Sequence, residues 1–262
     1  MKLSRSEIEY NQILQRVVSS VEKDIRNILL VEINSGKYTQ DSWITGIQMA
    51  LDALIDKWSS SSFKRLANQI ASRFVRTTVN NLDRHQKRSF GIDVLQNSPE
   101  AEDLMRVAAI QNAQLIKSIP EQYLNSVSNI VLSNMRAGLM PREIAKQLEE
   151  QFGITQRRAR FIARDQTAKV NGELTERRQR DAGYEYFKWI DSDDQRVRKR
   201  HRDIANADVG YGVGIYRWDD LPKSDDGTPI KPGQDYGCRC TSRPIRNSIV
   251  ERNMNQSKEK AA

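Results

Sequence analysis

The residues of this chain that are best suited to chemistry gather near its C-terminal end. His201 is one of two histidines, and Cys238 and Cys240 are the two cysteines in a sequence of 262 residues. Cys238 with His201 has the types of a nucleophile and its base, and Asp194 with His201 those of a hydrolytic pair. Neither pair comes with a recognisable third group or oxyanion donor, and the arginines around His201 favour binding an anion over cleaving one. We therefore predict no catalytic residues and no enzyme. The alternative is a nuclease or transferase that uses His201 and Cys238.

The composition is typical of a helix-rich protein with a large wet surface. Hydrophobic residues make up 38% and charged residues 29%, against typical values of about 45–50% and about 25%. The net charge of +8 comes from 42 basic and 34 acidic residues. It fits a polyanionic partner without distinguishing DNA, RNA and an acidic protein surface. We expect no membrane segment and no signal peptide, and hence work in the cytosol or in a particle assembled there.

Apolar residues three and four positions apart predict helices over most of the first half of the chain. Their apolar stripes are expected to form a core. His85 lies in a charged segment and is expected to be solvated. A turn at Pro99 and a break at Pro120 separate the later helices. The predicted helices span about residues 5–33, 41–57, 63–82, 100–118 and 121–137.

A short helix between Pro141 and Gly153 and a long basic helix from about residue 156 to 181 are predicted next. A helical hairpin is favoured over a DNA-reading helix-turn-helix, because the short helix is not markedly basic on its exposed side. Gly172 lies within the basic helix, where glycine costs about 1 kcal/mol relative to alanine, so close packing or a bend is predicted there. Arginine forks suit phosphates, although a solvated charged face is the alternative. The candidate DNA-binding residues are Arg157, Arg158, Arg160, Arg164, Arg177, Arg178, Arg196 and Arg198.

Beyond Gly183 the pattern changes from a helical to a strand period. Residues 184–190 are aromatic and largely alternating, which predicts a strand. Acidic residues from Asp191 predict the start of a helix over 194–206, and a loop rich in glycine and proline follows. Short strands are predicted at residues 214–218 and 238–245, before a polar tail that we expect to be disordered. The predicted fold class is mainly α with a small α+β C-terminal module.

An ordered series of short motifs runs through the C-terminal half. The motifs are residues 160–167, Asn171, 182–184, 188–189, 194–198 with His201, Pro232 and Cys238–Cys240. In order and spacing, they resemble the phage Mu F-like head morphogenesis proteins, which are minor capsid proteins of tailed phages, over about residues 140–246. The resemblance implies a virion component that enters the prohead near the portal and contacts packaged DNA. It implies no measured enzymatic activity.

The resemblance also suggests a domain organisation and a set of partners. Residues 1–138 would form a helical region that contacts portal or capsid, 139–250 the Mu F-like domain, and 251–262 a polar tail. The implied partners are the portal protein, the major capsid or scaffold protein, and double-stranded DNA bound without sequence preference. The implied location is the phage head, after assembly in the host cytoplasm.

A zinc site is the one cofactor that the resemblance raises. Many relatives carry a Cys-x-x-Cys pair where this chain has residues 196–201, and with the later Cys-Arg-Cys that arrangement looks like a zinc site. This sequence departs from that pattern and offers His201, Cys238 and Cys240, with Asp203 or Asp194 as the fourth ligand. Structural zinc takes a carboxylate less commonly than thiolate or imidazole. We therefore expect no cofactor and a structural His201, with the two cysteines on opposite faces of one strand, and structural zinc is the alternative.

Overall fold

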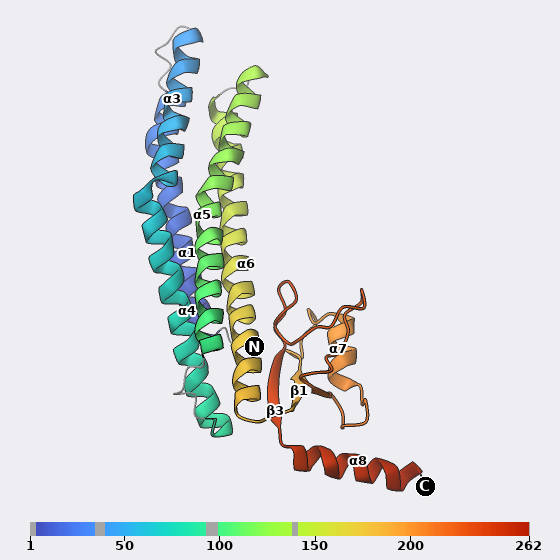
Figure 1. Ribbon diagram of the computed structural model, residues 1–262. Coiled ribbons are helices and arrows are strands. Elements are labelled where there is room, and N and C mark those ends of the chain that lie inside the picture. The colour runs from blue at the N-terminus through green and yellow to red at the C-terminus, as the bar shows by residue number, and fades with distance from the viewer. Residues whose placement is uncertain (1–3, 35–39, 93–98, 138–140, 262) are drawn as a thin grey trace. The chain divides into compact units, whose positions relative to one another are not determined.

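The computed structural model describes residues 4–34, 40–92, 99–137 and 141–261. It confirms a mainly helical chain with a small antiparallel sheet in its C-terminal part (Figure 1). One compact unit, here called the helical unit, comprises residues 7–74 and 109–163; the mixed unit comprises 1–6, 75–108 and 164–262. These units interleave along the sequence, whereas the predicted domains are consecutive, and the predicted boundaries stay a prediction. No helix in the described ranges is long and apolar enough to cross a membrane.

The first helical stretch contains a π-helical segment. It begins with α1 (Arg5–Asp24), continues through the π segment (Ile25–Leu30) and ends with α2 (Val31–Asn34). Ile25 and Leu29 of the π segment are both buried in the core. Helix α3 (Gln40–Ser59) follows as predicted, and α4 (Ser61–Phe90) extends beyond its predicted end. His85 is exposed, as predicted.

The helices of the helical unit run alongside one another (Figure 1). One apolar core of this unit is built from the end of the first helical stretch, from α3, and from the helices that carry residues 123–131 and 144–148. The largest buried members are Ile25, Leu29, Ile33, Ile47, Leu51, Leu54, Tyr123, Leu124, Val127, Val131, Ile144 and Leu148.

Helix α5 runs unbroken from Pro99 to Arg136, so the break predicted at Pro120 is wrong. Proline inside a helix removes one backbone hydrogen bond and costs about 3 kcal/mol. On the two sides of Pro120, Ile116, Ile119 and Tyr123 are at most 1% exposed. Burial of each large apolar side chain contributes about 1.5–3 kcal/mol. The continuous apolar stripe therefore outweighs the local loss at the proline.

Helix α6 is also a single helix, Pro141–Asp181, so the break predicted at Gly153 and both short-helix readings are wrong. Leu148 before the glycine and Ala159 after it are both buried. The Thr155 hydroxyl donates a hydrogen bond of 3.0 Å to the Gln151 carbonyl across the glycine. A glycine permits a helix to end but does not require it, and here the buried stripe continues.

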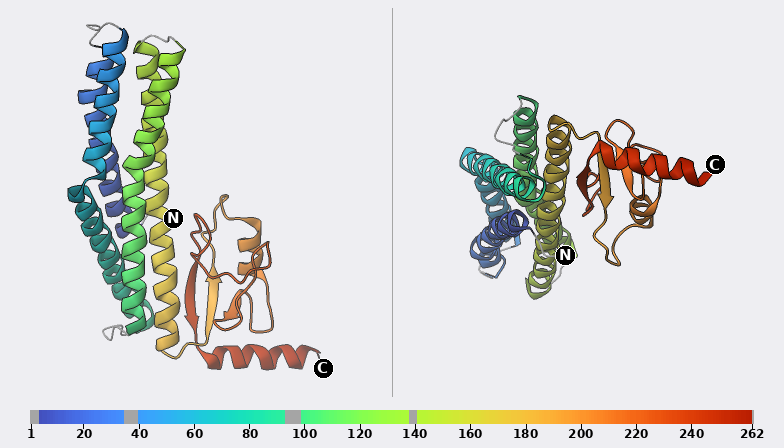
Figure 2. Two further views of the ribbon diagram at one scale, coloured as in Figure 1. Left: turned by 45° about the horizontal axis from the view of Figure 1, so that its top comes forward. Right: turned by 90° about the horizontal axis from the view of Figure 1, so that it is seen from below.

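The sheet of the mixed unit has three antiparallel strands. β1 (Tyr186–Ile190) lies between β2 (Ile215–Arg217) and β3 (Thr241–Ile245). Phe187 and Trp189 of β1 are fully buried and pack with residues of helix α7 (Lys199–Asn206). Figure 2 shows the strands with α7 beside them and α8 at their end. The strands predicted at 184–190 and 214–218 are confirmed.

Two element boundaries predicted for the mixed unit are wrong. Helix α7 begins at Lys199 and not at Asp194, because the Asp194 carboxylate accepts from the Arg196 amide and from the Arg239 side chain instead of capping a helix. The last strand begins at Thr241 and not at Cys238.

Residues Asn247–Ala261 form helix α8 where a disordered tail was predicted. Val250 of this helix is 1% exposed and packs with Ile215 and Ile245 of the sheet. The Asn253 side chain also donates to the Tyr211 carbonyl at 2.8 Å. Burial of an apolar side on the sheet stabilises a helix whose average composition is polar.

Helix α6 and the loop before the cysteines cross at two glycines. A Cβ on Gly172 would lie 2.5 Å from the Pro232 carbonyl oxygen. A Cβ on Gly233, whose φ is +86°, would lie 2.7 Å from the Ala168 carbonyl oxygen. The close packing predicted at Gly172 is therefore confirmed. This crossing fixes the path of the chain towards Cys238.

Candidate functional site

His201, Cys238 and Cys240 meet inside the mixed unit, and we call them the thiol–imidazole cluster. The Sγ atoms of Cys238 and Cys240 each lie 3.5 Å from Nδ1 of His201. The possible ligand atoms of all three residues lie within 4.8 Å of one another, and all three residues are buried. In the described part of the chain, no other group of three or more His, Cys, Asp or Glu residues comes together in this way.

A turn before β3 brings both thiols to the same imidazole. The Gly237 amide, at a residue with φ +67°, donates to the Asp165 carboxylate of α6 at 2.7 Å. The Cys240 amide donates to the Cys238 sulfur at 3.4 Å. Because the two cysteines precede the strand, the alternation of a strand does not apply to them. The predicted placement of the thiols on opposite faces is therefore wrong.

Asp235 orients the imidazole, although it is not among the site residues predicted from the sequence. Its Oδ2 lies 2.8 Å from Nε2 of His201, while the Trp189 ring packs edge-on at 5.5 Å. With Nε2 held by the carboxylate, Nδ1 faces the sulfurs. A carboxylate behind a histidine is also the arrangement that orients metal-bound imidazoles. The signal available in the sequence was an aspartate three residues before Cys238.

The two candidates for a fourth ligand lie elsewhere. Asp203 is exposed and accepts a hydrogen bond of 2.8 Å from Lys199. Asp194 forms a two-pronged ion pair with Arg239, which lowers the pKa of Asp194 to about 2; the Arg196 amide adds to this effect. Neither carboxylate joins the cluster.

The cluster has the dimensions of one face of a zinc tetrahedron. Zn–S bonds of about 2.3 Å and Zn–N bonds of about 2.0–2.1 Å at the tetrahedral angle place sulfur and nitrogen about 3.6 Å apart. The two sulfur–nitrogen distances here are both 3.5 Å. Two thiols and one imidazole are also a donor set that zinc prefers. The residues fit a zinc ion with three protein ligands and a fourth position left for water or another group.

Electrostatics favour a thiolate at Cys238. Hydrogen bonding with the Cys240 thiol, and then with His201, lowers the pKa of Cys238 below that of an ordinary thiol. The pKa of Cys240 is raised, first by its hydrogen bond to Cys238 and then by burial. Hydrogen bonding with Cys238 raises the pKa of His201. A thiolate beside an imidazolium is a nucleophilic arrangement, whereas a metal would bind the thiolates and the deprotonated imidazole.

The predicted DNA-binding arginines differ in how exposed their side chains are. Arg157 and Arg160 of α6 are exposed, as is Arg196 before α7. The Arg198 side chain is also exposed, and donates to the Tyr236 carbonyl at 2.6 Å. Arg164 is half-buried. The exposed members are suited to contact a phosphate backbone.

Arg158, Arg177 and Arg178 form hydrogen bonds or ion pairs with residues of the protein itself. Arg158 donates to the Ser118 hydroxyl at 2.9 Å and to its carbonyl. Arg177 pairs with Asp181 and Glu100. Arg178 is only 4% exposed and pairs with Asp83 of α4, so it does not reach a surface. Burial lowers the pKa of Arg178, which the charge of Asp83 partly offsets. The sequence alone did not distinguish these inward arginines from outward ones.

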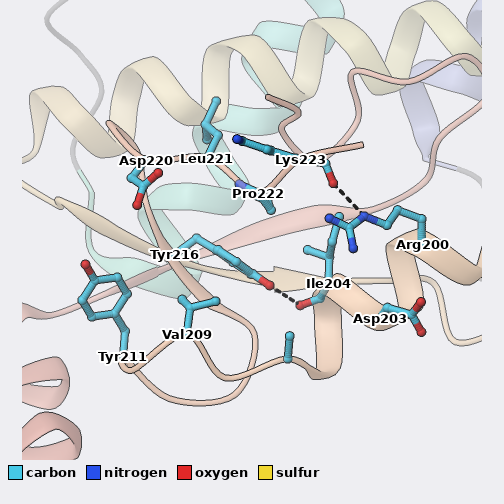
Figure 3. A pocket seen from close by; sticks show the side chains of 11 residues that line it. Arg200, Asp203, Ile204, Val209, Tyr211, Tyr216, Asp220, Leu221, Pro222 and Lys223 are labelled. Atoms are coloured by element: carbon cyan, nitrogen blue, oxygen red, sulfur yellow. Dashed lines mark hydrogen bonds between the residues drawn. The ribbon is translucent and has the colours of Figure 1, made fainter. Parts of the chain in front are cut away.

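A pocket of about 340 Å³ lies beside α7 (Figure 3). The Tyr216 hydroxyl donates to the Ile204 carbonyl at 2.8 Å, and Arg200 Nε donates to the Lys223 carbonyl at 2.7 Å. In both hydrogen bonds, a polar atom of the pocket wall is bound to a backbone carbonyl of the protein itself. The rest of the lining is mainly apolar, and Asp203 lies at its edge (Figure 3). This pocket is separate from the thiol–imidazole cluster and was not anticipated.

Comparison with known families finds a match to one segment of this chain. Residues 125–243 match the family described as Phage Mu protein F like protein. That segment carries the whole thiol–imidazole cluster, and its match confirms the predicted resemblance to the phage Mu F-like family. The family suggests a protein of phage head morphogenesis.

One curated relative shares most of the length of this chain. The chain is 32% identical over 252 residues to an uncharacterized protein of Haemophilus influenzae. The match covers 92% of this chain and 53% of the relative. The chain therefore spans about half the length of that relative. No solved structure matches the chain.

Proposed function

We propose that this protein is a minor head protein of a tailed phage or prophage, which acts in prohead assembly near the portal and contacts packaged DNA. The match of residues 125–243 to the phage Mu F-like family carries the proposal. The net charge of +8 and the exposed Arg157, Arg160 and Arg196 support contact with DNA without sequence preference. The protein would assemble in the host cytoplasm and end in the virion.

Exposed apolar side chains on α3 support a protein partner for the helical unit. Met49 is 67% exposed and Ile44 is 46% exposed. Large apolar side chains left in water mark candidate protein contacts. The portal and the major capsid or scaffold protein are the proposed partners.

Co-purification with assembling heads tests the assembly role. The wild-type chain is expected to sediment with proheads or portal, and the variant Ile44→Glu with Met49→Glu to be depleted from them. Gln48→Glu changes an exposed position of the same helix and serves as the control. A chain that never sediments with heads or portal would contradict the proposal. DNA retention that is equal at low and high salt would contradict its DNA part.

We also propose that the thiol–imidazole cluster holds a structural zinc ion. The ion would tie α7 to the turn before β3, with water or another group as the fourth ligand. Elemental analysis of the protein purified under reducing conditions is expected to give about one equivalent, because a site built from two thiolates and an imidazole retains its zinc. His201→Ala should lose the metal, and His85→Ala, which changes the exposed histidine, should keep it. Clearly less than one equivalent in the wild type would remove the site.

A catalytic use of the cluster is the second candidate, and one observation favours it. Cys238, His201 and Asp235 form a thiol–imidazole–carboxylate series, so a third group exists after all. However, Cys238 and His201 are each only 3% exposed, which leaves a substrate no direct access to the sulfur. We therefore propose a structural role and no enzyme. Nuclease or transferase turnover that disappears in Cys238→Ala while folding and assembly survive would favour the enzyme.

A further inference from the structure

The sheet of the mixed unit has one buried face and one face that is only partly covered. Phe187 and Trp189 point into the core, so Tyr186, Lys188 and Ile190 of the same strand lie on the other face. Thr241 of β3 pairs with Ile190 across the strands. We call this second side the outer sheet face. Ile190 is 38% exposed, and Thr241 is exposed.

Two cations lie directly opposite each other on the outer sheet face. Lys188 of the central strand pairs in register with Arg243 of β3. Directly opposed residues in an antiparallel pair have Cβ atoms about 4.5–5.5 Å apart and share a face. Like charges at that position destabilise the strand pair. A second sheet contact does not relieve them, since the other partner of Lys188 is Ile215.

Neither of these two cations has an acidic partner among the residues that the structure describes, in contrast to three other cations of the same unit. Arg217, Lys231 and Arg239 form ion pairs with Asp219, Glu176 and Asp194. Throughout the described ranges, no ion pair or side-chain hydrogen bond joins Lys188 or Arg243 to another residue. Arg243 is exposed and Lys188 is half-buried. The strand pair thus keeps two adjacent positive charges that the protein itself does not neutralise.

The two ends of the outer sheet face differ in how accessible they are to a ligand. Helix α8 covers the end with Ile215 and Ile245 through Val250. The end with Ile190, Thr241 and Arg243 stays accessible. An ammonium beside a guanidinium offers donors and charge suited to a phosphate, and the Thr241 hydroxyl adds a neutral donor next to them.

We propose that Lys188 and Arg243 form a phosphate-binding site on the outer sheet face that holds the backbone of duplex DNA. The proposal rests on the proposed contact with packaged DNA and names a place for it that the sequence analysis did not. DNA is favoured over an acidic protein surface because the chain as a whole is basic, with a net charge of +8. Binding at this site is independent of base sequence, since only phosphates are held.

Salt-dependent DNA binding of the full-length chain tests the site. The probe is a labelled duplex of arbitrary sequence, measured by fluorescence anisotropy between 50 and 200 mM salt. Each phosphate contact contributes about 0.9 to the slope of log affinity against log salt, so Lys188→Gln with Arg243→Gln should lower that slope by about 2. Affinity at the lowest salt should fall about tenfold or more. Lys188→Arg with Arg243→Lys keeps both charges and should keep the slope.

The matched control removes the same charge elsewhere. Lys64→Gln with Arg73→Gln changes two exposed cations of α4 and should leave the slope nearly unchanged. The test variant should also melt no lower than the wild type, because it removes a like-charge pair. A slope equal to that of the control, or a lowered melting temperature with the DNA loss, would overturn the site while leaving the proposed function intact.

Two further outcomes separate the remaining possibilities. If the wild type shows no salt-sensitive DNA binding at all, the DNA part of the proposed function fails together with this site. If DNA binding of the test variant is normal but its co-purification with heads is lost, the face serves an acidic protein partner and the phosphate site is overturned.

Discussion

Substitution of Gly172 by alanine should destabilise the mixed unit, although alanine is the better helix former. In an exposed helix interior this change stabilises by about 1 kcal/mol. At Gly172 the new Cβ would lie 2.5 Å from the Pro232 carbonyl oxygen, with Gly233 Cα at 3.6 Å. Both neighbours are backbone atoms, so relief requires the whole loop to move. Overpacking of this kind costs about 1–3 kcal/mol. The balance is a net loss of up to about 2 kcal/mol.

The same helix supplies a matched control. A Cβ on Gly153 would meet only the tip of the Arg157 side chain, at 3.6 Å. Gly153→Ala should therefore stabilise by about 0.5–1 kcal/mol, the full gain in helix propensity. The two variants make the same glycine-to-alanine change within α6, but their effects on the free energy of unfolding should have opposite signs.

Urea denaturation followed by tryptophan fluorescence measures both variants. Trp189 and Trp218 report on the mixed unit, which contains Gly172, and Trp58 reports on the helical unit, which contains Gly153. Hydrogen exchange of the amides around residues 233–240 should also rise in Gly172→Ala, because the loop that carries Cys238 is displaced. If Gly172→Ala stabilised the protein as much as Gly153→Ala, the close helix–loop contact described here would be refuted.

Three further predictions concern charges. Asp83→Ala leaves the buried Arg178 guanidinium unpaired and should lower the free energy of unfolding by about 2–3 kcal/mol. This is somewhat less than for a fully buried pair, because Asp83 is 31% exposed. Urea denaturation measures the change, and a loss below about 0.5 kcal/mol would contradict the prediction. Lys188→Gln should raise the free energy of unfolding by about 0.2–1 kcal/mol by removing the repulsion with Arg243, and an unchanged or lower urea midpoint would count against that repulsion. The pKa of Asp194 is depressed to about 2, mainly by Arg239, so its stabilising contribution is present above the ordinary pKa of about 3.9 and is lost as the pH falls through about 2. Wild type and Asp194→Asn should therefore differ in urea midpoint at pH 5 and converge near pH 2, and a difference independent of pH would exclude this origin.

Periodic apolar patterns predicted where helices form, but the helix ends predicted at single proline and glycine residues were wrong. The stripes through Leu14, Val21 and Leu54 correspond to buried side chains. Pro120 and Gly153 were interpreted as ends because local preference favours a break at each. Each costs only a few kcal/mol, and a long buried stripe on both sides exceeds that cost. The decision depends on tertiary packing, which local preference does not contain.

The cluster residues could be predicted from the sequence, whereas their geometry could not. Cys238, Cys240 and His201 are conspicuous by rarity. The convergence of both thiols depends on a turn held by Gly237 and by Asp165 of a distant helix. Asp235 is an ordinary acidic residue in a loop until the fold brings it to His201. Arg178 looked like its exposed neighbours for the same reason, since its inward direction depends on Asp83 of another helix.

The crossing of Gly172 with Gly233 has a consequence for how the chain matures. Gly172 is synthesised about sixty residues before Gly233, so this part of α6 leaves the ribosome well before the loop that packs against it. The central strand around Trp189 likewise waits for β3, which begins at Thr241. Contacts so distant in sequence form slowly. A nascent chain stopped before residue 240 would therefore expose the Phe187 and Trp189 side chains, and chaperone demand during synthesis should fall only when the last strand emerges.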